Sequence, residues 1–282
     1  MSFNMPNNNS IVIFTIDSLY SVIILNQILP VLRNKVALIV LSDRYKGKHG
    51  SFFKQFRKNL SRSGWSFVLY LNLIFVLHNF FIFFHNIYFK FSKTIPNFLT
   101  ISYLTRKFNI PVIKIADINS HRSEKILREI NPDIIISCYF DQLIKRNIYE
   151  IPKIETINFH SGSLPTYRGP FPPFWALLHG QKKFSIHAHV VEEKFDTGPT
   201  LAKCDYSPTK ITSLLQLECE LYREMGKFIL EFFSNFNQNN KLTVHNDGTE
   251  GYYGFPSKKD IIEMKKMGIP LYNINDFLKE LF

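Results

Sequence analysis

Short apolar runs alternate along most of the chain with longer stretches of mixed polarity. Such runs are typical of strands buried on both faces, and the stretches between them have the length and periodicity of helices. The predicted strands are residues 11–16, 36–42, 111–116, 133–139, 155–160, 185–192 and 199–206. The predicted helices run to about residue 32 after the first strand and then over 99–108, 121–130, 141–149 and 172–179. Strands alternating with helices predict an α/β protein whose mostly parallel sheet is covered by helices on both faces.

One stretch, residues 65–89, contains no Asp, Glu, Lys or Arg. Its length would permit a membrane span. Polar residues nevertheless recur in it at intervals of six or seven, which places them on one face of a helix. These residues are Asn72, His78, Asn79, His85 and Asn86. Three alternatives stay open: a long helix packed on the body of the protein, a helix lying on a membrane surface, and a span.

The C-terminal part begins with a long predicted helix at 211–236. The remainder, which includes GYYGFP at 251–256 and a final short helix, is typical of a small appendage. We therefore divide the chain into a main domain at 10–210, with an apolar helical insertion at about 64–92, and a C-terminal part at 211–282.

Composition and charge indicate the cellular compartment of the protein and the kind of ligand its basic segment could bind. Three scattered cysteines are too few for a disulfide framework or a zinc motif, and the first ten residues lack the features of a secretory signal, so we expect a cytoplasmic protein. The net charge is +11, of which +6 comes from residues 43–62, where seven Lys or Arg stand against one acid. That segment is interpreted as a solvated loop or as a surface that holds phosphates or lipid headgroups.

Candidate chemistry lies at the end of the strand 155–160. Asn158 and His160 are two residues apart, so their side chains share one face of the strand, and the turn FDTG brings Asp196. When an amine attacks a carbonyl, an amide N–H and an imidazolium can donate to the developing oxyanion. A carboxylate near a histidine can relay the proton from the attacking to the leaving nitrogen. The three residues fit acyl transfer to an amine, although each motif alone also occurs in structural roles.

These motifs occur here in a characteristic order: INFH at 157–160, LPTYRG at 164–169 and FDTG at 195–198. Together they resemble the folate-dependent formyltransferases, which include methionyl-tRNA, glycinamide ribonucleotide and sugar N-formyltransferases. The resemblance implies a Rossmann-like fold, 10-formyltetrahydrofolate as co-substrate, and Asn158, His160 and Asp196 as catalytic residues. It also implies a pterin site formed with Asp196 and, mainly through backbone groups, by the segment after the preceding strand. The residues of that segment are Phe140, Gln142, Leu143 and Ile144.

One departure from the family pattern is His187, where the family often has Thr. With His189 it forms a pair on one strand face near His160, and three histidines could suggest zinc. The resemblance implies that no metal is needed.

The acceptor amine is inferred by elimination among the branches of the family. The glycinamide ribonucleotide branch has a glycine-rich phosphate loop after the first strand, and the turn Asp17-Ser18-Leu19 is not such a loop. The tRNA branch has a C-terminal barrel that is longer than the part after the long helix here. The hydrolase branch normally has a regulatory domain ahead of the catalytic one, whereas the first strand here begins at residue 11. We therefore expect an amino sugar on a nucleotide or lipid carrier, and no nucleic acid. Formylation of methionyl-tRNA or another amine, and a non-catalytic membrane-associated protein of the same fold, remain alternatives. Contact with the inner face of the membrane through 65–89 and a homodimer also stay open.

Overall fold

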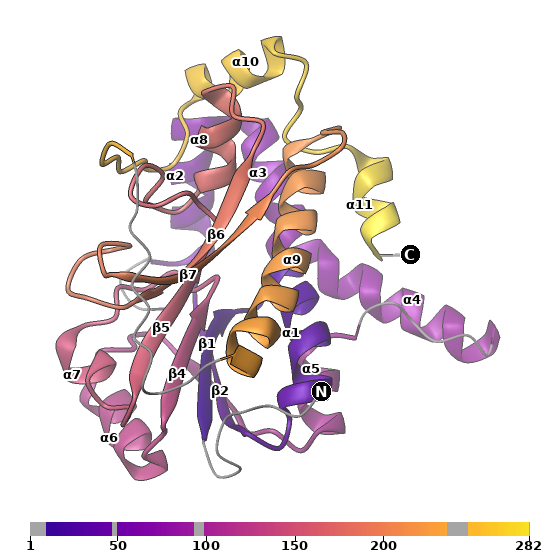
Figure 1. The fold of residues 1–282 in the computed structure, drawn as a ribbon. Helices are drawn as coiled ribbons and strands as arrows, with labels where there is room; N and C mark the ends of the chain where they lie inside the picture. Colours follow the sequence, from indigo (N-terminus) through magenta and orange to yellow (C-terminus); the bar gives the residue numbers. More distant parts are fainter. Residues whose placement is uncertain (1–9, 47–49, 93–98, 236–247, 282) are drawn as a thin grey trace.

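A single sheet of seven strands forms the centre of the computed structural model, which describes residues 10–46, 50–92, 99–235 and 248–281 (Figure 1). The strands are β1 (Ile11–Ile16), β2 (Val36–Ser42), β3 (Val112–Ile115), β4 (Ile134–Cys138), β5 (Glu155–His160), β6 (Phe184–Val190) and β7 (Thr200–Tyr206). Their order is β3-β2-β1-β4-β5-β6-β7. The first five are parallel, whereas β6 and β7 pair antiparallel. The predicted mostly parallel α/β sheet is confirmed.

Helices cover both faces of this sheet. They are α1 (Leu19–Leu32), α2 (Phe52–Ser63), α3 (Trp65–Asn72), α4 (His78–Ser92), α5 (Ile101–Lys107), α6 (His121–Ile130), α7 (Arg146–Tyr149), α8 (Pro172–Leu178), α9 (Leu214–Asn235), α10 (Lys258–Lys266) and α11 (Ile274–Leu281). Successive residues of β1 point to opposite faces, so Ile13 joins the core beneath α1 and α9 while Phe14 joins the core beneath α6 and α7. Burial on both faces explains why the strands are continuous apolar runs.

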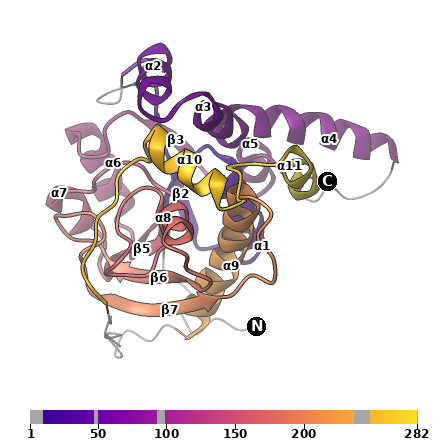
Figure 2. The same cartoon turned by 90° about the horizontal axis from the view of Figure 1, so that it is seen from above.

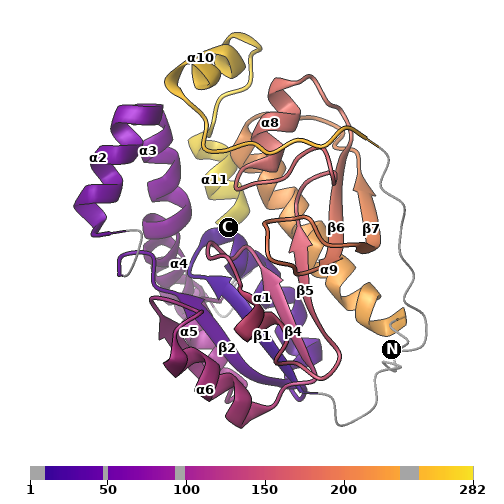
Figure 3. The same ribbon diagram turned by 90° about the vertical axis from the view of Figure 1, so that its left-hand side faces the viewer.

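The long helix α9 is part of the main core. It packs against α1, and its buried residues belong to the same cluster as those of β1. The proposed division of the chain at residue 210 therefore stays a prediction. The C-terminal region contains two helices, α10 and α11, where the sequence had predicted one. Figure 3 shows α10 beside α8 and α2, and α10 contacts both of them.

The second half of the basic segment 43–62 is helical rather than a solvated loop. Helix α2 begins at the N-cap Ser51 and ends at Gly64, whose φ of +84° favours glycine. Within this basic segment Lys48 lies outside the described residues, and the Arg44 guanidinium lies 3.6 Å from the Phe75 ring centroid and 3.7 Å from the Asp141 carboxylate.

Helices α3 and α4 continue through a π-helical turn, Leu73–Leu77, into one long helical segment that projects beyond the sheet (Figure 1). The stretch Trp65–Phe84 is long and apolar enough to cross a membrane by length and composition, but 44% of an 18-residue window within it is buried against the protein. His78 is fully buried, with Nε2 3.5 Å from Asp17 Oδ1, and Asn79 donates to the same oxygen at 3.2 Å.

The polar residues of this segment therefore lie against the protein, where the usual amphipathic arrangement would expose them to solvent. The Asn79 hydrogen bond and the 3.5 Å approach of His78 to Asp17 offset part of the cost of burying this polar side, but among the described residues neither ring nitrogen of His78 has a hydrogen-bond partner. The side chains of His85 and Asn86 lie outside the described residues.

Candidate active site

The pairing of β5 with β6 brings four polar side chains together. In the antiparallel register Asn158 is directly opposite His189, and His160 is directly opposite His187. Directly opposed residues on one sheet face lie within contact distance, and the two-residue period of each strand keeps the next pair on the same face. The sheet therefore positions a compact polar group at the carboxyl end of β5, where open α/β sheets bind ligands.

Asp196 reaches this group from the turn between β6 and β7. Its φ of +57° lies in the left-handed region, which Asp tolerates better than most residues. Two residues later, a Cβ at Gly198 would lie 2.0 Å from the Val190 carbonyl oxygen, so the turn can fold back onto β6 only with glycine there. The sequence FDTG thus directs the carboxylate of Asp196 back over the sheet.

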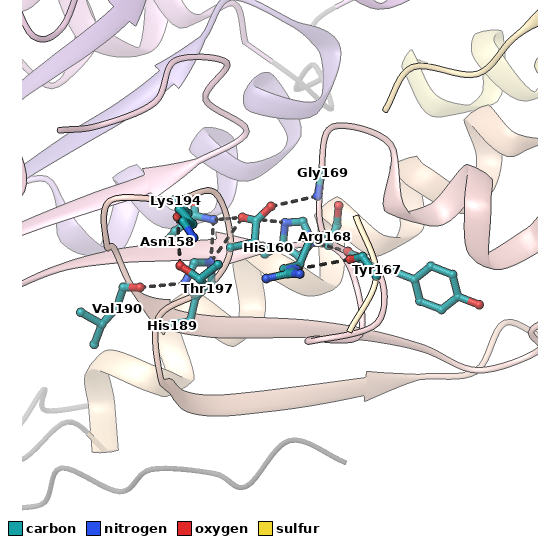
Figure 4. Close-up of polar contacts among 12 residues, drawn as sticks. Asn158, His160, Tyr167, Arg168, Gly169, His189, Val190, Lys194 and Thr197 are labelled. Atoms are coloured by element: carbon teal, nitrogen blue, oxygen red, sulfur yellow. Dashed lines mark hydrogen bonds and ion pairs between the residues drawn. The ribbon is translucent and has the colours of Figure 1, made fainter. Parts of the chain in front are cut away.

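Three nitrogen atoms converge on one oxygen of Asp196, and Figure 4 shows the Asn158, His160 and His189 side chains that carry them grouped together. Oδ1 lies 3.4 Å from Asn158 Nδ2, 3.4 Å from His160 Nδ1 and 3.5 Å from His189 Nε2. These distances are slightly longer than ordinary hydrogen bonds, as is common in catalytic sites before substrate binds. Asn158, His160 and Asp196, predicted from the sequence as one group, lie together.

The other ring atoms define the tautomers of the two histidines. His160 Nε2 lies 2.8 Å from the Tyr167 carbonyl oxygen, and His189 Nδ1 lies 2.8 Å from the Val190 carbonyl oxygen. Because a carbonyl only accepts, each of these nitrogens carries a proton. In its neutral form His189 then accepts from the Asn158 amide through Nε2 at 3.0 Å, and His160 presents the lone pair of Nδ1 toward Asp196.

The second oxygen of Asp196 is held by the LPTYRG loop. Oδ2 accepts from the Gly169 N–H at 3.0 Å. Gly169 has a φ of +110°, and a Cβ there would lie 2.1 Å from the Tyr253 carbonyl oxygen. Only glycine fits this crossing of two backbone segments.

The C-terminal region braces that loop. Arg168 N donates to the Gly251 carbonyl at 3.1 Å, Tyr253 N donates back to the Arg168 carbonyl at 2.9 Å, and Trp175 Nε1 donates to the Gly254 carbonyl at 2.9 Å. The segment GYYGFP is therefore part of the site's support, a role that the sequence did not indicate.

Burial and neighbouring groups shift the pKa values of Asp196, His160 and His187. Burial is the largest influence on Asp196 and acts to raise its pKa, but His160, His189 and the Gly169 N–H together lower the pKa to about 2. Burial lowers the pKa of His160, although Asp196 and the Tyr167 carbonyl oppose it. Burial likewise lowers the pKa of His187 to about 4. At neutral pH the site therefore combines the Asp196 carboxylate with neutral imidazoles at His160 and His187.

This combination is suited to proton transfer. A neutral imidazole beside a carboxylate can accept a proton, because the imidazolium formed is stabilised by the negative charge. Within the described residues, no group of three or more His, Cys, Asp or Glu side chains is arranged to hold a metal ion, and His187 Nδ1 instead lies 3.4 Å from Thr200 Oγ1.

The predicted pterin segment follows β4, the strand next to β5, at the same edge of the sheet. Gln142 is fully engaged: Oε1 accepts from Ile118 N at 2.8 Å, and Nε2 donates to Ser42 Oγ at 2.9 Å. Ile144 is buried in the core, whereas Phe140 and Leu143 are half-buried. The pterin site in this segment stays a prediction.

A buried acid lies behind the site. Glu218 of α9 is 2% exposed and accepts hydrogen bonds from Tyr20 at 2.5 Å and from Tyr70. Tyr20 stacks on Tyr222, whose hydroxyl lies 3.1 Å from Ser161 Oγ, next to His160. The sequence carried no sign of this cluster, since a lone Glu in an amphipathic helix is usually exposed.

Comparisons with known proteins agree with this geometry. Residues 106–219 match the family model described as formyl transferase. A methionyl-tRNA formyltransferase from Kosmotoga olearia is 28% identical over 172 residues, which cover 61% of this chain and 55% of that protein. The chain thus spans about half the length of the curated relative it matches.

Solved structures share the fold over more of the chain. A sugar N-formyltransferase from Shewanella sp FDAARGOS_354 superposes with a TM-score of 0.55 at 12% identity, covering 90% of this chain and 86% of the other. The N-formyltransferase from Helicobacter canadensis in complex with folinic acid and dTDP-3-aminofucose gives a TM-score of 0.51 at 14% identity, covering 90% and 72%. Residues 106–219 are therefore similar to the formyl transferase family, and the chain shares the fold of these solved N-formyltransferases.

Proposed function

We propose that this protein transfers a formyl group from 10-formyltetrahydrofolate to a primary amine, with Asn158, His160 and Asp196 as catalytic residues. The observation that carries the proposal is the convergence of Asn158, His160 and His189 nitrogens on Oδ1 of a buried, ionised Asp196. Solved members of the fold that bind folinic acid, such as the Helicobacter canadensis enzyme, support a folate donor.

The proposed reaction begins when the amine nitrogen attacks the formyl carbon. The new C–N bond forms as the carbonyl π electrons move onto oxygen. The Asn158 hydrogen that points at Asp196 over 3.4 Å makes only a weak hydrogen bond, so an oxyanion lying along that N–H can replace Asp196 as its acceptor while the second hydrogen stays on His189. His189 acts here as a positioning residue.

Proton transfer then completes the exchange. The attacking nitrogen loses its proton to His160 Nδ1, and the resulting imidazolium is paired with Asp196 at 3.4 Å. The same proton passes to the leaving nitrogen of tetrahydrofolate as the bond from that nitrogen to the formyl carbon breaks. These proton transfers require a neutral His160 and an ionised Asp196, which agrees with the lowered pKa of each group.

The acceptor that we propose is an amino sugar on a nucleotide or lipid carrier. The similarity to sugar N-formyltransferases extends over 90% of the chain, and one of them holds dTDP-3-aminofucose. A second candidate is methionyl-tRNA, because the matching curated relatives include methionyl-tRNA formyltransferases.

Release of tetrahydrofolate tests the proposal. The protein would be incubated with 10-formyltetrahydrofolate and a panel of amino-sugar nucleotides, lipid-linked amino sugars and methionyl-tRNA, and each acceptor analysed by mass spectrometry for the gain of one formyl unit. His160→Ala should abolish release, whereas the exposed His121→Ala serves as the matched control. A wild-type protein that formylates none of the panel, or equal rates in both variants, would contradict the proposal.

A further inference from the structure

The outward side of the α3–α4 segment is an apolar stripe. Its exposed residues are 38% to 63% accessible and recur mostly at intervals of three, four or seven, which places them along one side of the helix. They are Trp65, Leu69, Val76, Leu77, Phe80, Phe83, Phe84 and Ile87. Among the exposed residues of 65–87 whose side chains are described, only Ser66 is polar. So long an apolar stripe on a protein surface indicates an interaction site.

The inward side of the same segment is fixed to the protein. Phe67 and Ile74 are fully buried, Tyr70 donates to Glu218, and His78 lies against Asp17. A spanning orientation would require all of these contacts to break, and Glu218 would lose Tyr70 while Asp17 would lose His78 and Asn79. The segment is therefore suited to lie against a surface, with its outward stripe in contact.

Positive charge accompanies the stripe. Between Arg44 and Ala116 the sequence contains twelve Lys or Arg and no Asp or Glu. Helix α2 presents Lys54, Arg57 and Lys58 to solvent. It packs against α3, with the Phe56 and Trp65 rings 5.8 Å apart, and Figure 2 shows α2, α3 and α4 in one row along one side of the molecule.

We propose that this row, named the α2–α4 face, docks the protein in the plane of an anionic lipid bilayer. The apolar stripe would enter the boundary between headgroups and acyl chains, while Lys54, Arg57 and Lys58 pair with lipid phosphates. A second copy of the chain fits the face less well, because a symmetric contact would bring two acid-free basic surfaces together. The docking involves none of the catalytic residues, so it can fail while the proposed function holds.

Charge dependence is tested first, with vesicles of phosphatidylcholine alone or mixed with phosphatidylglycerol. Wild-type protein should cosediment with the mixed vesicles and release as salt is raised. The double variant Lys54→Gln/Lys58→Gln should lower the partition coefficient about thirtyfold, since each basic residue near an anionic surface contributes about fivefold. The matched control Arg122→Gln/Lys125→Gln, on α6 across the sheet, should bind as wild type does.

The stripe is tested with Leu69→Ser/Phe80→Ser, which removes two apolar groups that are 49% and 57% exposed. We expect a roughly tenfold or greater loss of vesicle binding, with tetrahydrofolate release unchanged. Val31→Ser/Ile262→Ser, at comparably exposed positions outside the face, is the matched control.

Three results would overturn the proposal. One is the absence of wild-type binding to phosphatidylglycerol vesicles at low salt, and another is stripe variants that bind as tightly as their control. The third is analytical ultracentrifugation showing that Leu69→Ser/Phe80→Ser converts a dimer into a monomer, because a second copy would then cover the face.

Discussion

Replacing Glu218 by glutamine should make the stability of this protein less sensitive to rising pH. The carboxyl is buried beneath α1 and α3 and accepts from Tyr20 and Tyr70. Burial, which outweighs these two hydrogen bonds, raises the pKa of Glu218 to about 7 from the ordinary 4.5. The folded protein therefore keeps this proton to a higher pH than the unfolded chain does.

The sign and size of the effect follow from proton linkage. Between the two pKa values the folded state binds more protons, so raising the pH through this window lowers the free energy of unfolding. The difference between about 7 and 4.5, at about 1.4 kcal/mol per pH unit, corresponds to about 3 kcal/mol. Glutamine has no such proton, so Glu218→Gln should gain about 3 kcal/mol relative to wild type between about pH 4.5 and about pH 7.5.

The measurement must compare the two proteins, because His187 has the opposite effect. Burial lowers the pKa of His187 to about 4 from 6.5, so its contribution to stability is lost as the pH falls through this range and rises with pH. Urea unfolding of wild type and Glu218→Gln at several pH values, followed by circular dichroism, isolates Glu218. Glu129→Gln, at an exposed position of α6, controls for the amide itself. A stability difference that does not change with pH would refute the reasoning.

Four further substitutions address the site and the core. Asp196→Asn should reduce tetrahydrofolate release by about 10²–10⁴-fold, since the carboxylate that stabilises the imidazolium is lost; release near the wild-type rate would exclude this role. His189→Phe should lower kcat by about 10²-fold by releasing Asn158, with little change in KM for the folate, a split that steady-state kinetics can measure. Gly169→Ala should destabilise the loop by about 1–3 kcal/mol in thermal unfolding and lower activity as well, because its φ is +110° and a Cβ would meet a backbone carbonyl. Phe67→Ala should cost about 3–5 kcal/mol in the same assay, because the side chain is fully buried, and a loss below about 1 kcal/mol would contradict its place in the core.

Much of the sheet could be predicted from the sequence because each strand is a local apolar run. The predicted strand 155–160 coincides with β5, and the two-residue period of a strand already placed Asn158 and His160 on one face. The spacing to FDTG marked Asp196 as their partner through resemblance to the formyltransferases. These features depend on near neighbours in the chain, so local patterns suffice to find them.

Periodicity could not decide the orientation of the segment 65–89. A repeat of polar residues defines a face but not the direction in which that face points. Here His78 and Asn79 point inward because both contact the carboxylate of Asp17, which is distant in the sequence and lies at the end of β1. Only this tertiary partner leaves the apolar side facing outward.

The sequence by itself determined the α/β fold and the identity of the three candidate catalytic residues. The tertiary structure decided their environment: the strand register that sets His189 opposite Asn158, the C-terminal segment that braces the loop holding Asp196, and the burial of Glu218. Each of these depends on which distant segments meet. Their hydrogen bonds, burial and pKa values arise only when the chain is folded.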